Sequence, residues 1–241
     1  MIIERRAAER GQADHGWLRS AHTFSFASYY DPQWMGFGPL RVINEDRVAG
    51  GGGFAPHGHA NMEIVSVVLS GELAHRDSHG NAGVIRSGDV QWMSAGHGVE
   101  HSEMNGGATD PVHFLQIWVQ PNQVNATPQY GQEQYSFESR LDQWVTLAAP
   151  EGRDGGLPWR QDAVLFGRGL RKSDATTRQL DPTRRYWLQI LSGELEVELG
   201  GGAVRVLQAG DALGFVDEEG ELALRQHAED DVQLLWFDLP R

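Results

Sequence analysis

LSGEL occurs twice in this chain, at residues 69–73 and at 191–195. A Gly-Asp pair follows each copy at the same interval, and each copy then leads to a segment containing tryptophan, LQIWV at 115–119 and LLWFD at 234–238. A shared pentapeptide, an equal interval and similar terminal segments indicate an internal repeat. We therefore expect two related domains in tandem. The glycines of LSGEL should lie in turns that need a positive φ, and Gly88-Asp89 and Gly210-Asp211 in hairpin-type turns.

Hydrophobic alternation predicts strands throughout the chain. In ELEVELGGGAVRVL (194–207), apolar residues alternate with glutamates and the alternation resumes after a glycine turn, which is typical of a hairpin with one buried face. Segments 62–73, 112–119 and 232–239 are more continuously apolar, as buried strands are. Because long helical periodicity is absent, the chain is predicted to be all-β.

The repeat also predicts the domain organisation. Residues 1–135 are expected to form an N-terminal domain and residues 136–241 a C-terminal domain. The connection should lie within 121–160, where polar residues, proline and glycine are frequent.

Composition excludes several classes of function. The 241 residues include 40% hydrophobic and 22% charged residues, no cysteine, and a formal net charge of −13. This charge repels phosphate backbones and anionic membranes, so neither direct nucleic-acid binding nor membrane association is expected. Without cysteine there are no disulfides and no thiolate metal sites. The first residues lack the apolar core of a signal peptide, and we expect a cytoplasmic protein.

Two pairs of polar side chains predict a metal centre. His57 and His59 stand two residues apart in FAPHGHANME (54–63), and His101 and Glu103 show the same spacing in GHGVEHSEMN (96–105). Residues i and i+2 of a strand share a face, so two strands can bring three imidazoles and one carboxylate to a single ion. This donor set suits Fe, Mn, Co, Ni, Cu or Zn and leaves positions open on an octahedral ion.

The carboxylate ligand is ambiguous at this level, because Glu63 lies four residues after His59 and strand parity places it on the same face. Either Glu63 or Glu103 satisfies the spacing. His75 and His79, in HRDSHGN (75–81), are expected in a solvated hairpin turn. His97 is either a loop residue or a contact close to the metal or substrate. The remaining histidines are interpreted as structural or surface residues: His15, His22, His113 and His227.

The sequence resembles the cupins, whose first motif is matched by Gly51, His57, His59 and Glu63 in GGGFAPHGHANME (51–63). The second cupin motif is matched by Gly88, His101 and Asn105, although the loop before His101 is longer than usual and Ser94 stands where the motif has proline. The fuller resemblance is to the pirin family and covers essentially the whole chain. It is carried by HTFSFASYYDP (22–32), FGPLRVINED (37–46), residues 75–103 and the second LSGEL domain.

The resemblance implies a bicupin, with two tandem cupin (jelly-roll) β-barrel domains and one metal in the N-terminal barrel. It implies the ligands His57, His59, His101 and Glu103, and so favours Glu103 over Glu63. In the C-terminal copy, the repeat offset places Gln179 and Asp181 at the two histidine positions. That domain is therefore expected to lack metal ligands.

The resemblance implies two alternative functions. Bacterial pirins resembling this chain open flavonols as quercetin 2,3-dioxygenases, using O2 and releasing CO. In that reaction Glu103 would take the proton of the flavonol hydroxyl, and another enol or catechol is a possible natural substrate. The alternative is a non-catalytic, metal- or redox-sensing pirin that regulates a protein partner. We expect one divalent metal ion, with Fe preferred among the ions named above, and a monomer.

Overall fold

The computed structural model describes residues 1–136 and 143–241, and this part of the chain is almost entirely β-structure. It contains no α-helix, only two short 3-10 turns at Ala7–Glu9 and Arg153–Gly155. The all-β prediction is confirmed. No helix of the described residues is long and apolar enough to cross a membrane.

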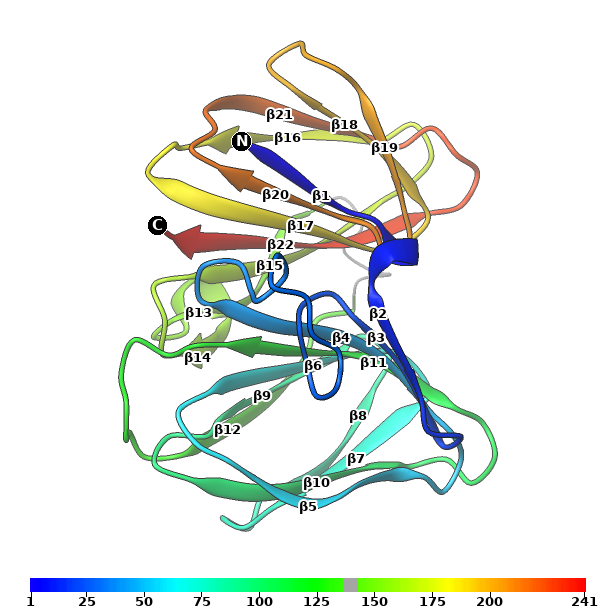
Figure 1. The fold of residues 1–241 in the computed structure, drawn as a ribbon, viewed down its shortest axis with the longest axis vertical. Coiled ribbons are helices and arrows are strands. Elements are labelled where there is room, and N and C mark those ends of the chain that lie inside the picture. Colours follow the sequence, from blue (N-terminus) through cyan, green and yellow to red (C-terminus); the bar gives the residue numbers. More distant parts are fainter. Residues whose placement is uncertain (137–142) are drawn as a thin grey trace.

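Two barrels lie one above the other (Figure 1). The first barrel pairs a seven-stranded sheet, in the order β12-β9-β6-β11-β4-β3-β2, with a four-stranded sheet, β5-β10-β7-β8. Its strands are β2 (Gly11–Asp14), β3 (Leu18–His22), β4 (Leu40–Val48), β5 (Gly53–His59), β6 (Glu63–Ser70), β7 (Glu72–Asp77), β8 (Ala82–Arg86), β9 (Asp89–Ser94), β10 (Val99–Asn105), β11 (Val112–Val119) and β12 (Gln129–Gln134).

The second barrel repeats this arrangement. Its seven-stranded sheet has the order β1-β20-β17-β22-β15-β13-β14, and its four-stranded sheet the order β16-β21-β18-β19. Its strands are β1 (Ile2–Arg5), β13 (Val145–Pro150), β14 (Leu157–Trp159), β15 (Val164–Leu170), β16 (Ala175–Leu180), β17 (Arg184–Ser192), β18 (Glu194–Leu199), β19 (Arg205–Gln208), β20 (Ala212–Val216), β21 (Gly220–Arg225) and β22 (Val232–Pro240).

The LSGEL turns have the predicted geometry, but the prediction that the Gly-Asp turns are hairpin turns was wrong. The strands before them, β8 and β19, pair within the four-stranded sheets, whereas β9 and β20 after them belong to the seven-stranded sheets, so each turn carries the chain from one sheet to the other. Gly71 and Gly193, the glycines of LSGEL, have φ values of 80° and 77°. The two Gly-Asp turns are closed by equivalent hydrogen bonds: Asp89 accepts one from the amide of Arg86 at 2.9 Å, and Asp211 one from the amide of Gln208 at 3.0 Å. The internal repeat is therefore a repeat of structure.

A shared apolar core joins the barrels. The two seven-stranded sheets face each other, and residues of β6, β9 and β11 belong to one buried cluster with residues of β15, β17 and β22. Trp92, Ile117, Trp187 and Phe237 are among its members. Along β6, Val65 and Val67 face this core whereas Ser66 and Val68 face the inside of the first barrel, as the two-residue period of a strand requires.

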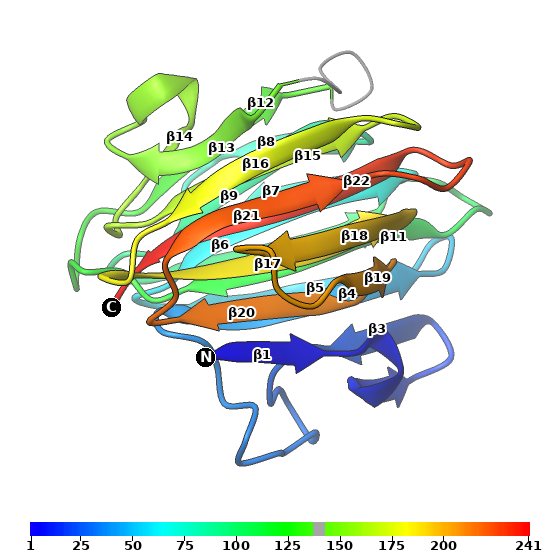
Figure 2. The ribbon, with the colours of Figure 1, turned by 90° about the horizontal axis from the view of Figure 1, so that it is seen from above.

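The N-terminal segment crosses between the barrels. β1 pairs with β20 at the edge of the second barrel and lies beside it when the molecule is seen from above (Figure 2), whereas β2 pairs with β3 in the first. The division into residues 1–135 and 136–241 remains a prediction, but β1 lies in the sheet formed by the C-terminal half.

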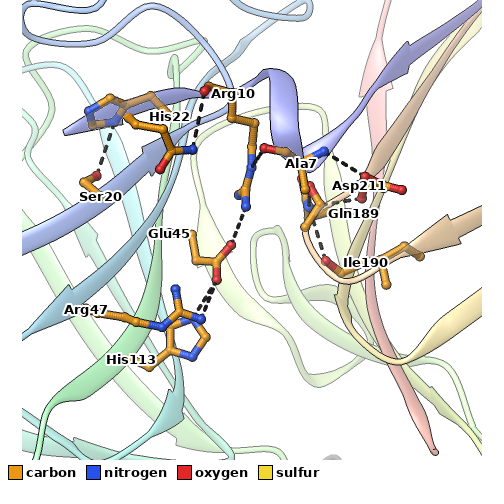
Figure 3. Close-up of polar contacts among 12 residues, drawn as sticks. Ala7, Arg10, Ser20, His22, Glu45, Arg47, His113, Gln189, Ile190 and Asp211 are labelled. Carbon is orange, nitrogen blue, oxygen red and sulfur yellow. Dashed lines mark hydrogen bonds and ion pairs between the residues drawn. The ribbon is translucent and has the colours of Figure 1, made fainter. Parts of the chain in front are cut away.

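A hydrogen bond and an ion pair join this crossing segment to the two barrels (Figure 3). The amide of Ala7 donates to Asp211 at 2.7 Å on the second barrel, and the Arg10 guanidinium donates to Glu45 at 2.8 Å on the first. Glu45 also contacts His113 at 2.9 Å. Burial opposes ionisation of Glu45, but the hydrogen bond of His113 and the charge of Arg10 outweigh it and lower the pKa of Glu45 to about 2.

Candidate metal centre

Neighbouring strands β5 and β10 bring three histidines together. His57 is opposite His101 in the antiparallel ladder, and His59 is opposite Val99. The ring centroids are 4.8 Å apart for His57–His59, 4.4 Å for His57–His101 and 4.9 Å for His59–His101. One nitrogen from each ring lies within 4.8 Å of those of the other two, a spacing that lets the three nitrogens converge on one ion.

A β-bulge in β5 determines the face of the strand to which these rings point. Opposite the two-residue step from His101 to Glu103, β5 advances three residues, from His57 to Phe54, with Pro56 in the extra stretch. Without the bulge, the odd spacing would put Phe54 and His57 on opposite faces, yet both line the same cavity. Proline is tolerated here because a bulge leaves the ladder incomplete.

The protonation of the cluster suits metal binding. Burial, followed by the charge of neighbouring histidines, lowers the pKa of His101 to about 3 and that of His59 to about 4. Both rings are therefore neutral at physiological pH, which is the form that coordinates metals. The Nδ1 of His57 donates to the carbonyl of Ala55 at 2.9 Å, which leaves its Nε2 with a lone pair. The buried Nε2 of His101 has no hydrogen-bond partner within the described residues.

Glu103 lies beside His101 but is held from the other sheet. Its carboxylate oxygens accept hydrogen bonds from Ser66 on β6 at 3.2 Å and from Gln116 on β11 at 2.7 Å. It belongs to a second group of close potential ligand atoms, with His75 and His101, rather than to the group of three histidines. Burial, only partly offset by the two hydrogen bonds, raises the pKa of Glu103 to about 7.

Glu63 lies elsewhere. β5 ends at His59, the chain turns through Asn61 with φ of 51°, and Glu63 begins β6 in the other sheet. Its carboxylate accepts hydrogen bonds from Trp92 Nε1 at 2.7 Å and from Ser94 at 2.6 Å, on the side that faces the second barrel. Strand parity across residues 59–63 was therefore a wrong assumption, because the turn separates the two strands.

His75 also differs from expectation. It is a buried residue of β7 rather than part of a solvated turn, whereas His79 is exposed. The Nδ1 atoms of His75 and His101 are 3.5 Å apart, and His75 Nε2 is 3.6 Å from a carboxylate oxygen of Asp77. LAHRD (73–77) shows no apolar-polar alternation, so the local sequence contains no signal for this burial, which follows from the pairing of His75 with Glu103 on β10.

A row of polar side chains crosses the first barrel opposite the metal centre. The ladder places them in register on neighbouring strands from β3 to β9, at His22, Asn44, Gln116, Ser66 and Gln91. His22 contacts Asn44 at 2.8 Å, and the Ser66 hydroxyl shares its single proton between Gln116 at 2.7 Å and Glu103 at 3.2 Å. Polar groups are costly in a barrel core unless they have partners, so this row indicates a functional interior.

The second barrel replaces both features with other side chains. Ladder positions equivalent to Asn44, Gln116, Ser66 and Gln91 hold Phe166, Trp236, Leu188 and Leu213. Those equivalent to His57, His59 and His101 hold Arg178, Leu180 and Leu222. The offset-based assignment to Gln179 and Asp181 was wrong because β16 lacks the bulge of β5. Within the described residues, both potential ligand groups lie in the first barrel.

A cavity of about 540 Å3 opens beside the histidine cluster and is lined by His57 and His59. Polar groups of the site, including His57, His59, Glu103 and Gln116, line one part of it. Its other walls are aromatic: Trp17, Phe26, Phe54 and Trp118. This size and lining fit a flat aromatic molecule held by a few polar contacts.

Comparison with known proteins agrees with this architecture. The pirin family profile matches residues 4–119, and a profile described as quercetinase C-terminal cupin domain matches residues 146–239. A protein of Escherichia coli (strain K12) named quercetin 2,3-dioxygenase is 42% identical over 240 residues, covering 100% of this chain and 99% of its own length. A pirin-like protein of Caulobacter vibrioides is 41% identical over 219 residues, covering 90% of this chain and 92% of its own.

Solved structures show the same fold. The crystal structure of YhhW from Escherichia coli superposes with a TM-score of 0.91 at 41% identity, covering 100% of this chain and 98% of that one. A second structure, of bacterial pirin YhhW in complex with nickel(II), has the same TM-score and identity and covers 99% of that chain. The two barrels, the repeat and these full-length relatives show that the chain belongs to the pirin family of two-domain cupins.

Proposed function

We propose that this protein is a metal-dependent dioxygenase that opens flavonol-type rings, as quercetin 2,3-dioxygenases do, with O2 as co-substrate and CO as a product. The observation that carries the proposal is the cluster of His57, His59 and His101, two members of which, His57 and His59, line an aromatic cavity. Two of these rings, His59 and His101, are neutral at physiological pH, which suits a divalent ion, and the adjoining cavity of substrate size would leave that ion accessible.

The proposed ligands are these three histidines and Glu103. The neutral rings of His59 and His101 fit a divalent transition ion, as does the His101 Nε2, which has no hydrogen-bond partner in the described part of the chain. Glu103 would complete the set from beside His101, with Ser66 and Gln116 orienting its carboxylate. Among the ions that such a set accepts, we propose iron. The affinity order of divalent ions by itself favours copper, so the selection of iron would depend on the supply of metals in the cell. The nickel(II) complex of YhhW supports a divalent ion in this family.

The side chains have distinct roles in the proposed reaction. Trp17, Phe54 and Trp118 would hold a planar substrate by ring contacts and exclude water from it. When bound, the ion supplies Lewis acidity that lowers the pKa of a coordinated hydroxyl. A carboxylate oxygen of Glu103 would then accept the proton of the enol hydroxyl, and its bonds to Ser66 and Gln116 would keep that oxygen in place.

The cavity is also the reason to prefer catalysis over a purely regulatory role. A protein that only reports metal oxidation state to a partner needs a surface, not an aromatic chamber of about 540 Å3 next to its metal. A sensor would bind its partner according to the oxidation state of the metal and would not consume O2. An enzyme would consume O2 when a flavonol is added.

The decisive experiment measures metal content and O2 consumption together. Protein purified without added ions is analysed for metals and then assayed aerobically with quercetin, with CO detected as product. His57→Ala should lose metal and O2 consumption, while Glu63→Gln, a buried carboxylate outside the cluster, should keep both. Metal-loaded protein that consumes no O2 with any flavonol would refute the proposed activity.

A further inference from the structure

Asp46 is a buried carboxylate in the cavity wall that has no part in the proposed metal centre. It lies on β4, two residues after Asn44, and is 4% exposed. Ser20 is opposite Asp46 in the ladder of β3 and β4, but the Oδ1 of Asp46 has no hydrogen-bond partner among residues 1–136 and 143–241. Leaving a buried acceptor unsatisfied costs folding free energy, so the position calls for an explanation.

The fold itself does not require an acid at this position. Asp46 is opposite Phe114 in the ladder of β4 and β11, and the equivalent ladder of β15 and β22 has Arg168 opposite Leu234. The same place in the repeated barrel therefore holds a side chain of the opposite charge. Contact with a molecule bound inside the first barrel therefore explains Asp46 better than a role in the packing of that barrel.

Asp46 lies where two compartments adjoin. The cavity beside the metal centre shares five lining residues with a second cavity of about 340 Å3, namely Trp17, Phe26, Asn44, Asp46 and Phe54. His57, His59 and Glu103 line only the first compartment, whereas His15, Ser20 and His22 line only the second. A molecule that places its reacting group against the three histidines can thus extend a remote part toward Asp46.

We infer that Asp46 determines specificity by accepting a hydrogen bond from a hydroxyl on a substrate ring remote from the reacting enol. The inference rests on the proposed function and names the substrate class more closely: aromatic enols that carry a further phenolic hydroxyl. An ionised carboxylate only accepts hydrogen bonds, so a ligand must bring the donor. The three aromatic walls shared by both compartments favour a flat phenol as that donor.

Three flavonols separate the possible positions of this hydroxyl. Flavonol itself has no remote hydroxyl, galangin adds hydroxyls on the fused ring, and quercetin adds further ones on the pendant ring. Dissociation constants are measured without O2 on the metal-loaded protein, by quenching of tryptophan fluorescence, since Trp17 and Trp118 line the cavity. Asp46→Asn is compared with the unaltered protein, with Asp46→Leu, and with Asp110→Asn, which makes the same chemical change at an exposed residue.

The expected result is a selective loss. The unaltered protein and Asp110→Asn should bind the hydroxylated flavonols about tenfold or more tightly than flavonol, the size of a hydrogen bond to a charged group. Asp46→Asn should reduce that ratio about tenfold, and Asp46→Leu should bind flavonol at least as well as before. The compound at which the ratio first falls, galangin or quercetin, identifies the ring that Asp46 contacts.

The outcomes distinguish this inference from the proposed activity. Equal ratios in Asp46→Asn and the unaltered protein would overturn the role of Asp46, whether or not O2 is consumed. If the unaltered protein prefers the hydroxylated flavonols and Asp46→Asn loses that preference, but no O2 is consumed, the dioxygenase activity is overturned and the binding role of Asp46 is supported. If none of the three flavonols binds, both proposals fail.

Discussion

Replacing Gln116 by leucine tests whether the polar row serves the metal centre at the expense of stability. Gln116 donates to Glu103 at 2.7 Å, and Ser66 supplies the other hydrogen bond at 3.2 Å. Gln116→Leu would leave a buried carboxylate with one partner. A hydrogen bond to a buried charged group contributes about 2 kcal/mol, so the free energy of unfolding should fall by about that amount.

A double variant makes the prediction specific. In the second barrel, Trp236 and Leu224 occupy the ladder positions of Gln116 and Glu103, and both belong to a buried apolar cluster. Gln116→Leu with Glu103→Leu should therefore be more stable than Gln116→Leu alone, with a coupling free energy of about 1–2 kcal/mol. The same double variant should lose metal, since Glu103 is a proposed ligand.

The assay is urea unfolding of the metal-free protein at about pH 8.5, where Glu103, with its pKa of about 7, is ionised. Unfolding is followed by fluorescence, and metal content is measured separately. The coupling free energy between Gln116 and Glu103 is obtained from the two single variants and the double variant. A double variant that is less stable than Gln116→Leu, or whose losses simply add, would show that the carboxylate and amide are not held there at a cost to stability. Full metal content in the double variant would remove Glu103 from the ligand set.

Three further predictions concern residues around the centre. His75→Phe keeps the ring volume but removes the 3.5 Å contact with His101, so metal affinity measured by chelator competition should fall about tenfold to a hundredfold; unchanged affinity would contradict an orienting role. Glu103→Gln should lower both metal content and turnover, whereas Glu63→Gln should change neither, and a reversal of this pattern would exchange their roles. The pKa of Glu45 is lowered from 4.5 to about 2, so its contribution, about 3 kcal/mol, is complete above pH 4.5 and is lost as the pH falls through 2. Urea unfolding between pH 6 and 2 should therefore show a flatter acid dependence in Glu45→Gln, and an unchanged slope would refute this.

Much of the fold follows from local sequence. The LSGEL repeat, its equal interval to the Gly-Asp turns and the two-residue alternation predicted two similar β domains, because turns and strand faces are set by neighbouring residues. The approach of His57, His59 and His101 follows similarly, since two i, i+2 pairs on adjacent strands meet wherever those strands pair.

The rest depends on which strands become neighbours, and that is a property of the tertiary structure. Sequence parity treated Glu63 and Glu103 alike, but the turn at Asn61 sends Glu63 into the other sheet and toward the second barrel. The local sequence pattern predicted neither the bulge in β5 nor the burial of His75, because both depend on pairing with the neighbouring strand β10. The place of Asp46 between two compartments was decided by packing across the barrel, where side chains distant in sequence share one interior.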